Sequence, residues 1–119
     1  MSKAKLLVVD DEEAIRNQMR WALADDYEVL LAEDRPSALA QMKQERPEVV
    51  LLDLGLPPAP RDATEGLQAL SELLAADRQA KVIVITGNHD RANALRAVEQ
   101  GAFDFFSKPA DLQDVRVVL

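Results

Sequence analysis

Several residues that could act together in phosphoryl transfer follow apolar runs along the chain. Asp10 and Asp11 follow the first run, and Asp53 follows a later one. A carboxylate can act as a nucleophile that forms an acyl phosphate, and grouped carboxylates suit Mg²⁺, which prefers oxygen ligands. Thr86 and Lys108 follow two further apolar runs and offer a hydroxyl and a positive charge for phosphate oxygens. These residue types indicate magnesium-assisted transfer of a phosphoryl group to an aspartate.

Each of these residues also has an ordinary structural explanation. An Asp pair before a helix commonly caps the helix, and a single Asp after a strand commonly caps a turn. A threonine suits a strand by intrinsic preference, and a loop lysine is normally solvated. Only the combination favours chemistry, because carboxylates brought into one crevice repel one another and raise one another's pKa values unless a cation joins them.

The elements that must position these residues alternate regularly. Apolar runs predict five strands, and segments with apolar residues at helical spacing predict five helices. This alternation predicts an α/β fold, a doubly wound five-stranded parallel sheet with helices on both faces and flavodoxin-like topology. The carboxyl ends of parallel strands then line one crevice. The predicted strands are residues 6–9, 27–32, 49–52, 82–85 and 103–106, and the predicted helices contain residues 15–23, 36–42, 67–74, 95–98 and 112–119.

Capping signals define two helix boundaries. Asp62 and Glu65 have the spacing of a capping box before the third helix, although Thr64 could cap this helix instead. Gly101 lies just past the fourth helix, where glycine commonly ends a helix. The fifth helix is still apolar at Leu119, so we expect residues 1–119 to form one domain whose final helix is truncated and which an output domain follows.

Composition narrows the function classes. The chain has 119 residues, of which 48% are apolar and 29% charged, as in an ordinary globular domain. The formal net charge of −7 disfavours direct contact with nucleic acid. There is no cysteine, no cleavage-like leader and no apolar run of membrane-spanning length. We therefore expect a cytoplasmic protein without a membrane partner.

Four segments together resemble the receiver domain of bacterial two-component response regulators. One such motif alone would be weak evidence, but four in order, covering essentially the whole chain, are specific. The resemblance implies a phosphorylation-dependent switch in a phosphorelay rather than a turnover enzyme. The segments are Val-Val-Asp-Asp-Glu at 8–12, Leu-Asp-Leu-Gly-Leu-Pro at 52–57, Ile-Thr-Gly at 85–87 and Gly-Ala-Phe-Asp-Phe-Phe-Ser-Lys-Pro at 101–109.

The resemblance also implies roles for the acidic residues. Asp53 would be the phosphoacceptor and would receive its group from a phosphohistidine of a sensor histidine kinase. Asp11 and Asp53 would ligate Mg²⁺ directly, together with the backbone carbonyl of Gly55. Asp10 would act on the same ion through water.

Three further roles follow from the same resemblance. Lys108 would contact the phosphoryl group, and a cis peptide bond would join it to Pro109. Thr86 would turn toward the phosphoryl group on activation, and Phe105 would be the aromatic switch residue that moves with it. The alternative for Phe105 is plain core packing.

The chain departs from the family pattern in the loop after Asp53. The glycine that follows the phosphoacceptor strand lies farther downstream here, at Gly66, and three prolines stiffen the longer loop. A longer surface loop is tolerated at little cost, but this one could also influence kinase choice or phosphoryl lifetime. The loop is similar to that of NtrC-type transcriptional activators of PEP-CTERM systems. That similarity implies an AAA+ ATPase and a DNA-binding domain downstream, with dimerisation on phosphorylation an open possibility.

Two other functions remain as alternatives. A pseudo-receiver would bind partners without phosphorylation, but every residue that the chemistry needs is present. A phosphatase of the haloacid-dehalogenase type would place a second aspartate two residues after Asp53. That position holds Gly55, so the general acid-base group is missing.

Overall fold

The computed structural model describes residues 3–58, 62–87 and 91–107. All five predicted strands form one parallel sheet with the order β2-β1-β3-β4-β5. The strands are β1 Ala4–Val9, β2 Tyr27–Ala32, β3 Val49–Asp53, β4 Lys81–Thr86 and β5 Asp104–Ser107. The described helices are α1 Glu13–Leu23, α2 Arg35–Glu45, α3 Thr64–Ala76 and α4 Arg91–Gln100.

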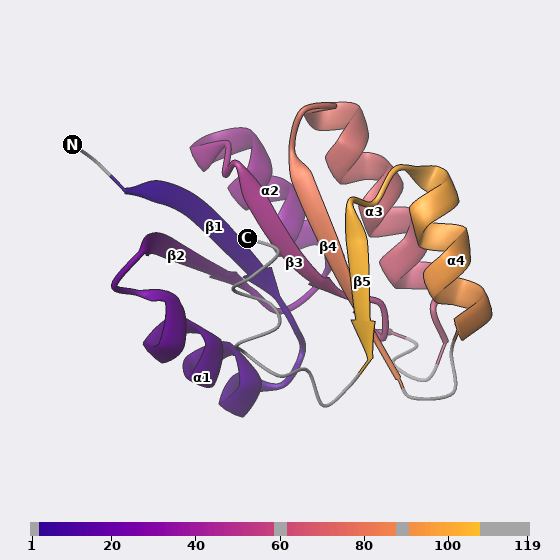
Figure 1. Ribbon diagram of the computed structural model, residues 1–119, viewed down its shortest axis with the longest axis horizontal. Coiled ribbons are helices and arrows are strands. Elements are labelled where there is room, and N and C mark those ends of the chain that lie inside the picture. The colour runs from indigo at the N-terminus through magenta and orange to yellow at the C-terminus, as the bar shows by residue number, and fades with distance from the viewer. Residues whose placement is uncertain (1–2, 59–61, 88–90, 108–119) are drawn as a thin grey trace.

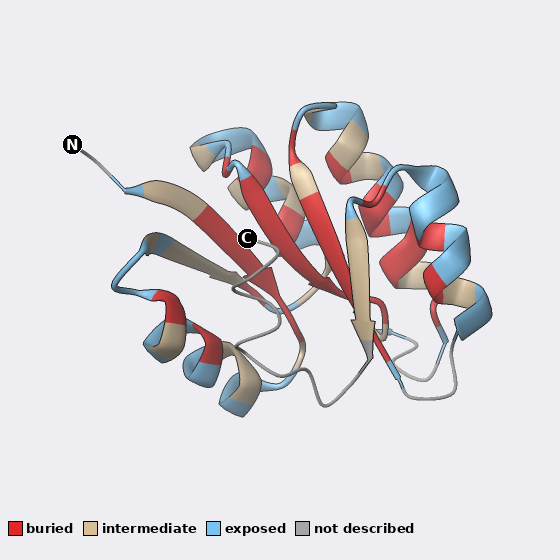
Figure 2. Cartoon of the chain, viewed as in Figure 1, coloured by how far each residue is buried: buried red, intermediate tan, exposed pale blue. Residues whose placement is uncertain are grey.

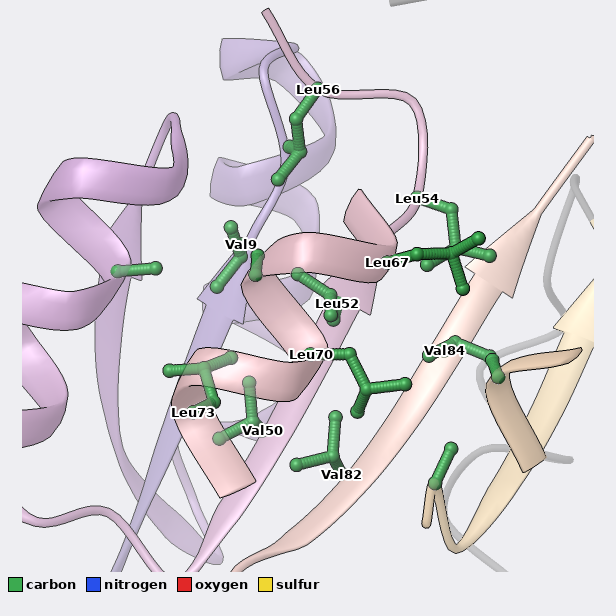
Figure 3. Packing of buried hydrophobic residues seen from close by; sticks show 14 of the residues in the cluster. Val9, Val50, Leu52, Leu54, Leu56, Leu67, Leu70, Leu73, Val82 and Val84 are labelled. Atoms are coloured by element: carbon green, nitrogen blue, oxygen red, sulfur yellow. The ribbon is translucent and has the colours of Figure 1, made fainter. Parts of the chain in front are cut away.

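Helices cover both faces of the sheet, as the sequence predicted (Figure 1). The apolar residues of α2, α3 and α4 pack on one face against Leu7, Val50 and Val82, and Figure 3 shows part of this cluster. On the other face, Met19 and Leu23 of α1 pack against the alternate strand residues. The prediction of a doubly wound α/β fold is therefore confirmed.

The central strands are buried along most of their length (Figure 2). All five residues of β3 are buried, as are the last five residues of β4. Helices on both faces explain this pattern, since strands covered twice need apolar residues at every position. The polar residues that end these strands are therefore carried on a rigid support.

The start of α2 is fixed by a capping box. The Asp34 carboxylate accepts a hydrogen bond from the Ser37 backbone N–H at 2.9 Å and from the Ser37 hydroxyl at 2.6 Å. These bonds, that of the Ser37 hydroxyl first, lower the pKa of Asp34 below its ordinary value. The helix ends at Arg46, which has the left-handed conformation (φ 50°). The chain thus enters α2 at a defined angle immediately after β2.

The start of α3 differs from the prediction. Neither Asp62 nor Thr64 is the N-cap: that position is Ala63, which has no side chain to cap with. The Asp62 carboxylate instead accepts hydrogen bonds from the backbone N–H and the hydroxyl of Thr64. The Glu65 carboxylate pairs with the Arg35 guanidinium at 2.8 Å. The predicted capping box is therefore wrong, because a tertiary ion pair outcompetes the local bond.

Other boundaries follow the sequence closely. Gly101 ends α4 with φ at +118°, a conformation that favours glycine. β5 begins at Asp104, one residue later than predicted, and Phe103 is exposed. Trp21 on α1 is 84% exposed. The predicted fifth helix, residues 112–119, lies outside the described residues.

Candidate functional site

The loop after β1 gathers three carboxylates. Asp10, Asp11 and Glu12 each present a carboxylate oxygen, and these oxygens lie within 4.8 Å of one another. Asp10 is 2% exposed, Asp11 is half-buried and Glu12 is exposed. Three negative charges this close together repel one another, whereas an oxygen-only donor set suits a hard cation. The donors present therefore fit Mg²⁺.

The ordinary explanation of the Asp pair as a helix cap does not hold. The N-cap of α1 is Glu12, and its side chain makes no capping bond. The Asp10 carboxylate accepts a hydrogen bond from the Glu12 backbone N–H at 2.9 Å and so tightens the turn before the helix. The Arg16 guanidinium donates to the Asp10 backbone carbonyl at 2.6 Å. Together these bonds fix the loop that presents the carboxylates.

Asp53 lies one strand away at the same edge of the sheet. Val9 of β1 pairs with Leu52 of β3, so Asp10 and Asp53 both follow directly after a paired position. Neighbouring parallel strands lie about 4.8 Å apart. Asp53 is 4% exposed, and its carboxylate accepts a hydrogen bond from the Gly55 backbone N–H at 3.0 Å. This bond is the predicted turn cap, and it also orients the carboxylate.

Thr86 completes the edge on the next strand. Asp53 pairs with Ile85 of β4, and Thr86 follows at the end of that strand with 2% exposure. Phe105 of β5 pairs with Val84 and packs, half-buried, against the core beneath α4. The core-packing explanation of Phe105 therefore holds for this structure. It leaves the predicted switch role as a proposal.

The burial pattern singles out this edge. Within the described residues, the buried polar or charged side chains are Asp10, Asp53 and Thr86, and all three stand at or just beyond the carboxyl end of a strand. Buried carboxylates cost free energy unless they are hydrogen-bonded or neutralised by a cation. A fold that places its buried polar groups at one sheet edge has a binding site there.

The remaining predicted site residues are placed as follows. Gly55 lies in the loop after β3, two residues from Asp53, with its backbone N–H on the Asp53 carboxylate. Lys108 and Pro109 lie outside the described residues. Asp53 is not a member of the cluster formed by Asp10, Asp11 and Glu12.

Sequence reasoning gave no role to two residues of this edge. Glu12 joins the carboxylate cluster, and the run of four consecutive acidic residues after a strand, residues 10–13, was the signal for it. Arg16 contacts the loop through its side chain, but an arginine on an amphipathic helix is normally solvated. Only the tertiary structure reveals that contact.

Comparison with known proteins decides the family. The family model of the response regulator receiver domain matches residues 6–119. The chain belongs to the response regulator receiver domain family. Regulatory protein AtoC of Escherichia coli is 30% identical over 97% of this receiver domain. The receiver domain spans only 24% of AtoC, so the activity of that whole protein is not carried over.

Solved structures agree with this assignment. NtrX from Brucella abortus superposes with a TM-score of 0.88 at 33% identity, covering 98% of this receiver domain and 26% of NtrX. A response regulator from Burkholderia pseudomallei superposes with a TM-score of 0.86 at 29% identity, covering 98% of this receiver domain and 66% of that chain. That crystal structure contains a phosphorylated aspartic acid, a calcium ion and citrate.

Membership of this family establishes the class of function. The receiver domain is a phosphoacceptor signalling module of two-component systems, and modules of this class act as signalling switches. The sequence prediction of the family, the fold and this role is confirmed. In the described part of the chain, no helix is long and apolar enough to cross a membrane.

Proposed function

We propose that Asp53 accepts a phosphoryl group from a phosphohistidine of a sensor histidine kinase. The observation that carries the proposal is the burial of Asp10, Asp53 and Thr86 at one sheet edge of a receiver domain. An Asp53 carboxylate oxygen attacks phosphorus, and the bond from phosphorus to the histidine nitrogen breaks as the new oxygen–phosphorus bond forms. The ring nitrogen keeps the electron pair of the broken bond and takes up one proton, so the histidine leaves as neutral imidazole.

The surrounding residues would manage charge in this reaction. Asp11 and Asp53 would ligate Mg²⁺ directly together with the Gly55 carbonyl, and Asp10 would act on the ion through water. The ion would neutralise negative charge on the transferring group. The hydrogen bond from the Gly55 N–H to the Asp53 carboxylate, at 3.0 Å, orients the nucleophile before the phosphodonor binds. Lys108 would provide a positive charge for a phosphoryl oxygen.

Phosphorylation would then bias a pre-existing equilibrium between two conformations. The Thr86 hydroxyl would donate to the phosphoryl group, and Phe105 on the adjacent strand would follow the movement of Thr86. β4 and β5 are directly paired, with Thr86 opposite Ser107, so a shift at one strand end reaches the other. We further propose that a longer cytoplasmic transcriptional regulator uses this change, through an AAA+ and DNA-binding output region and dimerisation.

Incubation with Mg²⁺ and a small phosphodonor tests the proposal. We expect the wild-type chain to gain the mass of one phosphoryl group, and Asp53→Asn to gain none, because an amide cannot form the acyl phosphate. Asp25→Asn is the matched control, since Asp25 is exposed and remote in sequence from the strand ends of the site. Intact-mass spectrometry after each reaction measures the outcome.

The alternatives give different results in the same assay. Wild-type protein that stays unmodified with every phosphodonor would indicate a pseudo-receiver. Sustained hydrolysis of phosphate esters would indicate a phosphatase. Modification that persists in Asp53→Asn would place the phosphoacceptor elsewhere.

A further inference from the structure

Arg35 links two helices beside the site. It is the first residue of α2, directly after the chain leaves β2, and its guanidinium binds two carboxylates of α3. Its Nε lies 2.8 Å from Glu65 Oε2, and its Nη1 lies 2.6 Å from Glu72 Oε1. These hydrogen bonds, that to Glu65 first, raise the pKa of Arg35. The capping box of Asp34 and Ser37 fixes the backbone that carries the guanidinium.

The residue next to Glu65 packs closely on the residue that follows β3. Gly66 packs on the backbone of Leu54, and a Cβ atom at Gly66 would overlap Leu54 Cα and lie 2.6 Å from the Leu54 carbonyl carbon. Any side chain would therefore force the helix and the strand apart. Gly66 brings α3 into direct backbone contact with the residue that follows Asp53.

Leu54 in turn joins the two residues of the proposed site. It lies between Asp53 and Gly55, and its N–H donates to the Ile85 carbonyl at 3.1 Å. Leu54 is 1% exposed, and Leu56 and Ala63 are also buried on either side of the long loop. The position of α3 therefore determines where the backbone of Leu54, and with it the Asp53–Gly55 turn, lies.

We propose that Arg35 is a positioning residue for phosphorylation and acts through α3 rather than by touching the phosphoryl group. The long loop after Asp53 is a weak constraint on α3, because a longer loop allows more relative positions of its ends. The apolar face of α3 packs on the sheet, and the two ion pairs add a polar constraint by tying α3 to the start of α2. Glu65 then keeps the adjacent Gly66 packed on Leu54. Leu54 in turn keeps the Asp53 carboxylate and the Gly55 carbonyl in the positions that the reaction needs.

This inference rests on the proposed role of Asp53, and Arg35→Gln tests it. We expect Arg35→Gln to slow phosphorylation by a small phosphodonor about tenfold and to weaken Mg²⁺ binding by a similar factor, as supporting residues of metal sites do. Calorimetric titration with Mg²⁺ and timed intact-mass measurements give the two values. Both are measured well below the midpoint of thermal unfolding of each variant, so that loss of folded protein does not contribute.

The matched control is Lys5→Gln. Lys5 forms an ion pair of the same 2.8 Å length with Glu45. This pair joins the start of β1 to the end of α2, at the end of the sheet away from the proposed site. We expect this variant to keep wild-type phosphorylation and Mg²⁺ affinity. Equal losses in the two variants would overturn the proposal, because ion-pair loss in general would then explain the effect.

A double-mutant cycle separates action through α3 from other effects. One arm of the cycle is Arg35→Gln, and the other combines Glu65→Gln with Glu72→Gln. If Arg35 acts through these two glutamates, adding Arg35→Gln to the variant that lacks both carboxylates changes the phosphorylation rate little further. Independent, multiplying losses would overturn the proposal, as would an Arg35→Gln variant that phosphorylates and binds Mg²⁺ like the wild type. Failure of the proposed function looks different, since wild-type protein would then remain unphosphorylated or Asp53→Asn would still be modified.

Discussion

The two ends of the sheet use charge in opposite ways. At the amino end, charged residues meet partners that favour them: Lys5 pairs with Glu45 at 2.8 Å, and the Lys81 ammonium lies 4.3 Å from the centre of the Phe103 ring. At the carboxyl end, carboxylates gather with one another, and two aspartates are buried.

This difference indicates which end was shaped for stability and which for function. Opposite charges at the amino end stabilise the fold modestly and need no ligand. Like charges at the carboxyl end cost free energy in the folded protein, and a bound cation offsets that cost. Residues that keep the carboxyl end in shape should therefore affect both stability and phosphorylation, and residues of the amino end only stability.

The largest effect on stability is expected from Gly66→Ala. Alanine is favoured over glycine within a helix by about 1 kcal/mol, but the new Cβ would meet backbone atoms of Leu54, which cannot rotate away. We expect a net loss of about 2 kcal/mol in the free energy of unfolding, measured by urea denaturation. Gly87→Ala is the control, because a Cβ there meets no atom of the described residues within 4 Å. Equal stability of the two variants would show that α3 does not pack tightly at the carboxyl end.

A smaller effect of opposite sign is expected from Asp11→Asn. Like charges 4–5 Å apart repel by about 1 kcal/mol in a water-like medium, so removing one from the cluster should stabilise the Mg²⁺-free protein by about that amount. Saturating Mg²⁺ should reverse the order, because a ligand at a hundred times its Kd stabilises the wild type by about 2.7 kcal/mol.

Thermal unfolding with a chelator and with Mg²⁺ measures both parts of this prediction. Asp25→Asn serves as the control, because it removes the same charge from an exposed position outside the cluster. If Asp11→Asn gains as much from Mg²⁺ as the wild type does, Asp11 is not a ligand.

Much of this architecture could be predicted from the sequence. The strands were recognisable because buried parallel strands require continuous apolar runs, such as residues 49–52, and their polar ends marked the sheet edge that carries Asp10 and Asp53. Gly101 was predictable as a helix end because only local backbone geometry decides it.

The missed features depend on contacts between distant segments. The capping box at Asp62 and Glu65 satisfied every local rule, but Arg35, thirty positions away from Glu65, binds that glutamate instead. Gly66 was visible only as a displaced family glycine, and its contact with the Leu54 backbone requires the packed structure. Spacing along one chain segment does not encode such pairings, since they depend on how α2, α3 and β3 pack together.

The smallest effect, and the sharpest test of the contrast between the two ends, is expected from Glu45→Gln. Hydrogen bonding to the Glu45 carboxylate raises the pKa of Lys5 above its ordinary value of 10.5. A raised pKa means that the pair contributes stability below pH 10.5 and that this contribution is lost as the pH rises through the folded-state value.

Glu45→Gln should therefore lower the urea midpoint slightly near neutral pH, by less than Gly66→Ala does. The difference should shrink in high salt, because both side chains are about one-third exposed and screened by ions. The difference should also vanish above the pKa of Lys5.

Glu48→Gln is the control, since its side chain is exposed and lies outside the ion pair. The rate of phosphorylation should stay unchanged in both variants. A slower rate in Glu45→Gln alone would show that the amino end also shapes the site, and the separation of stability from function between the two ends would no longer hold.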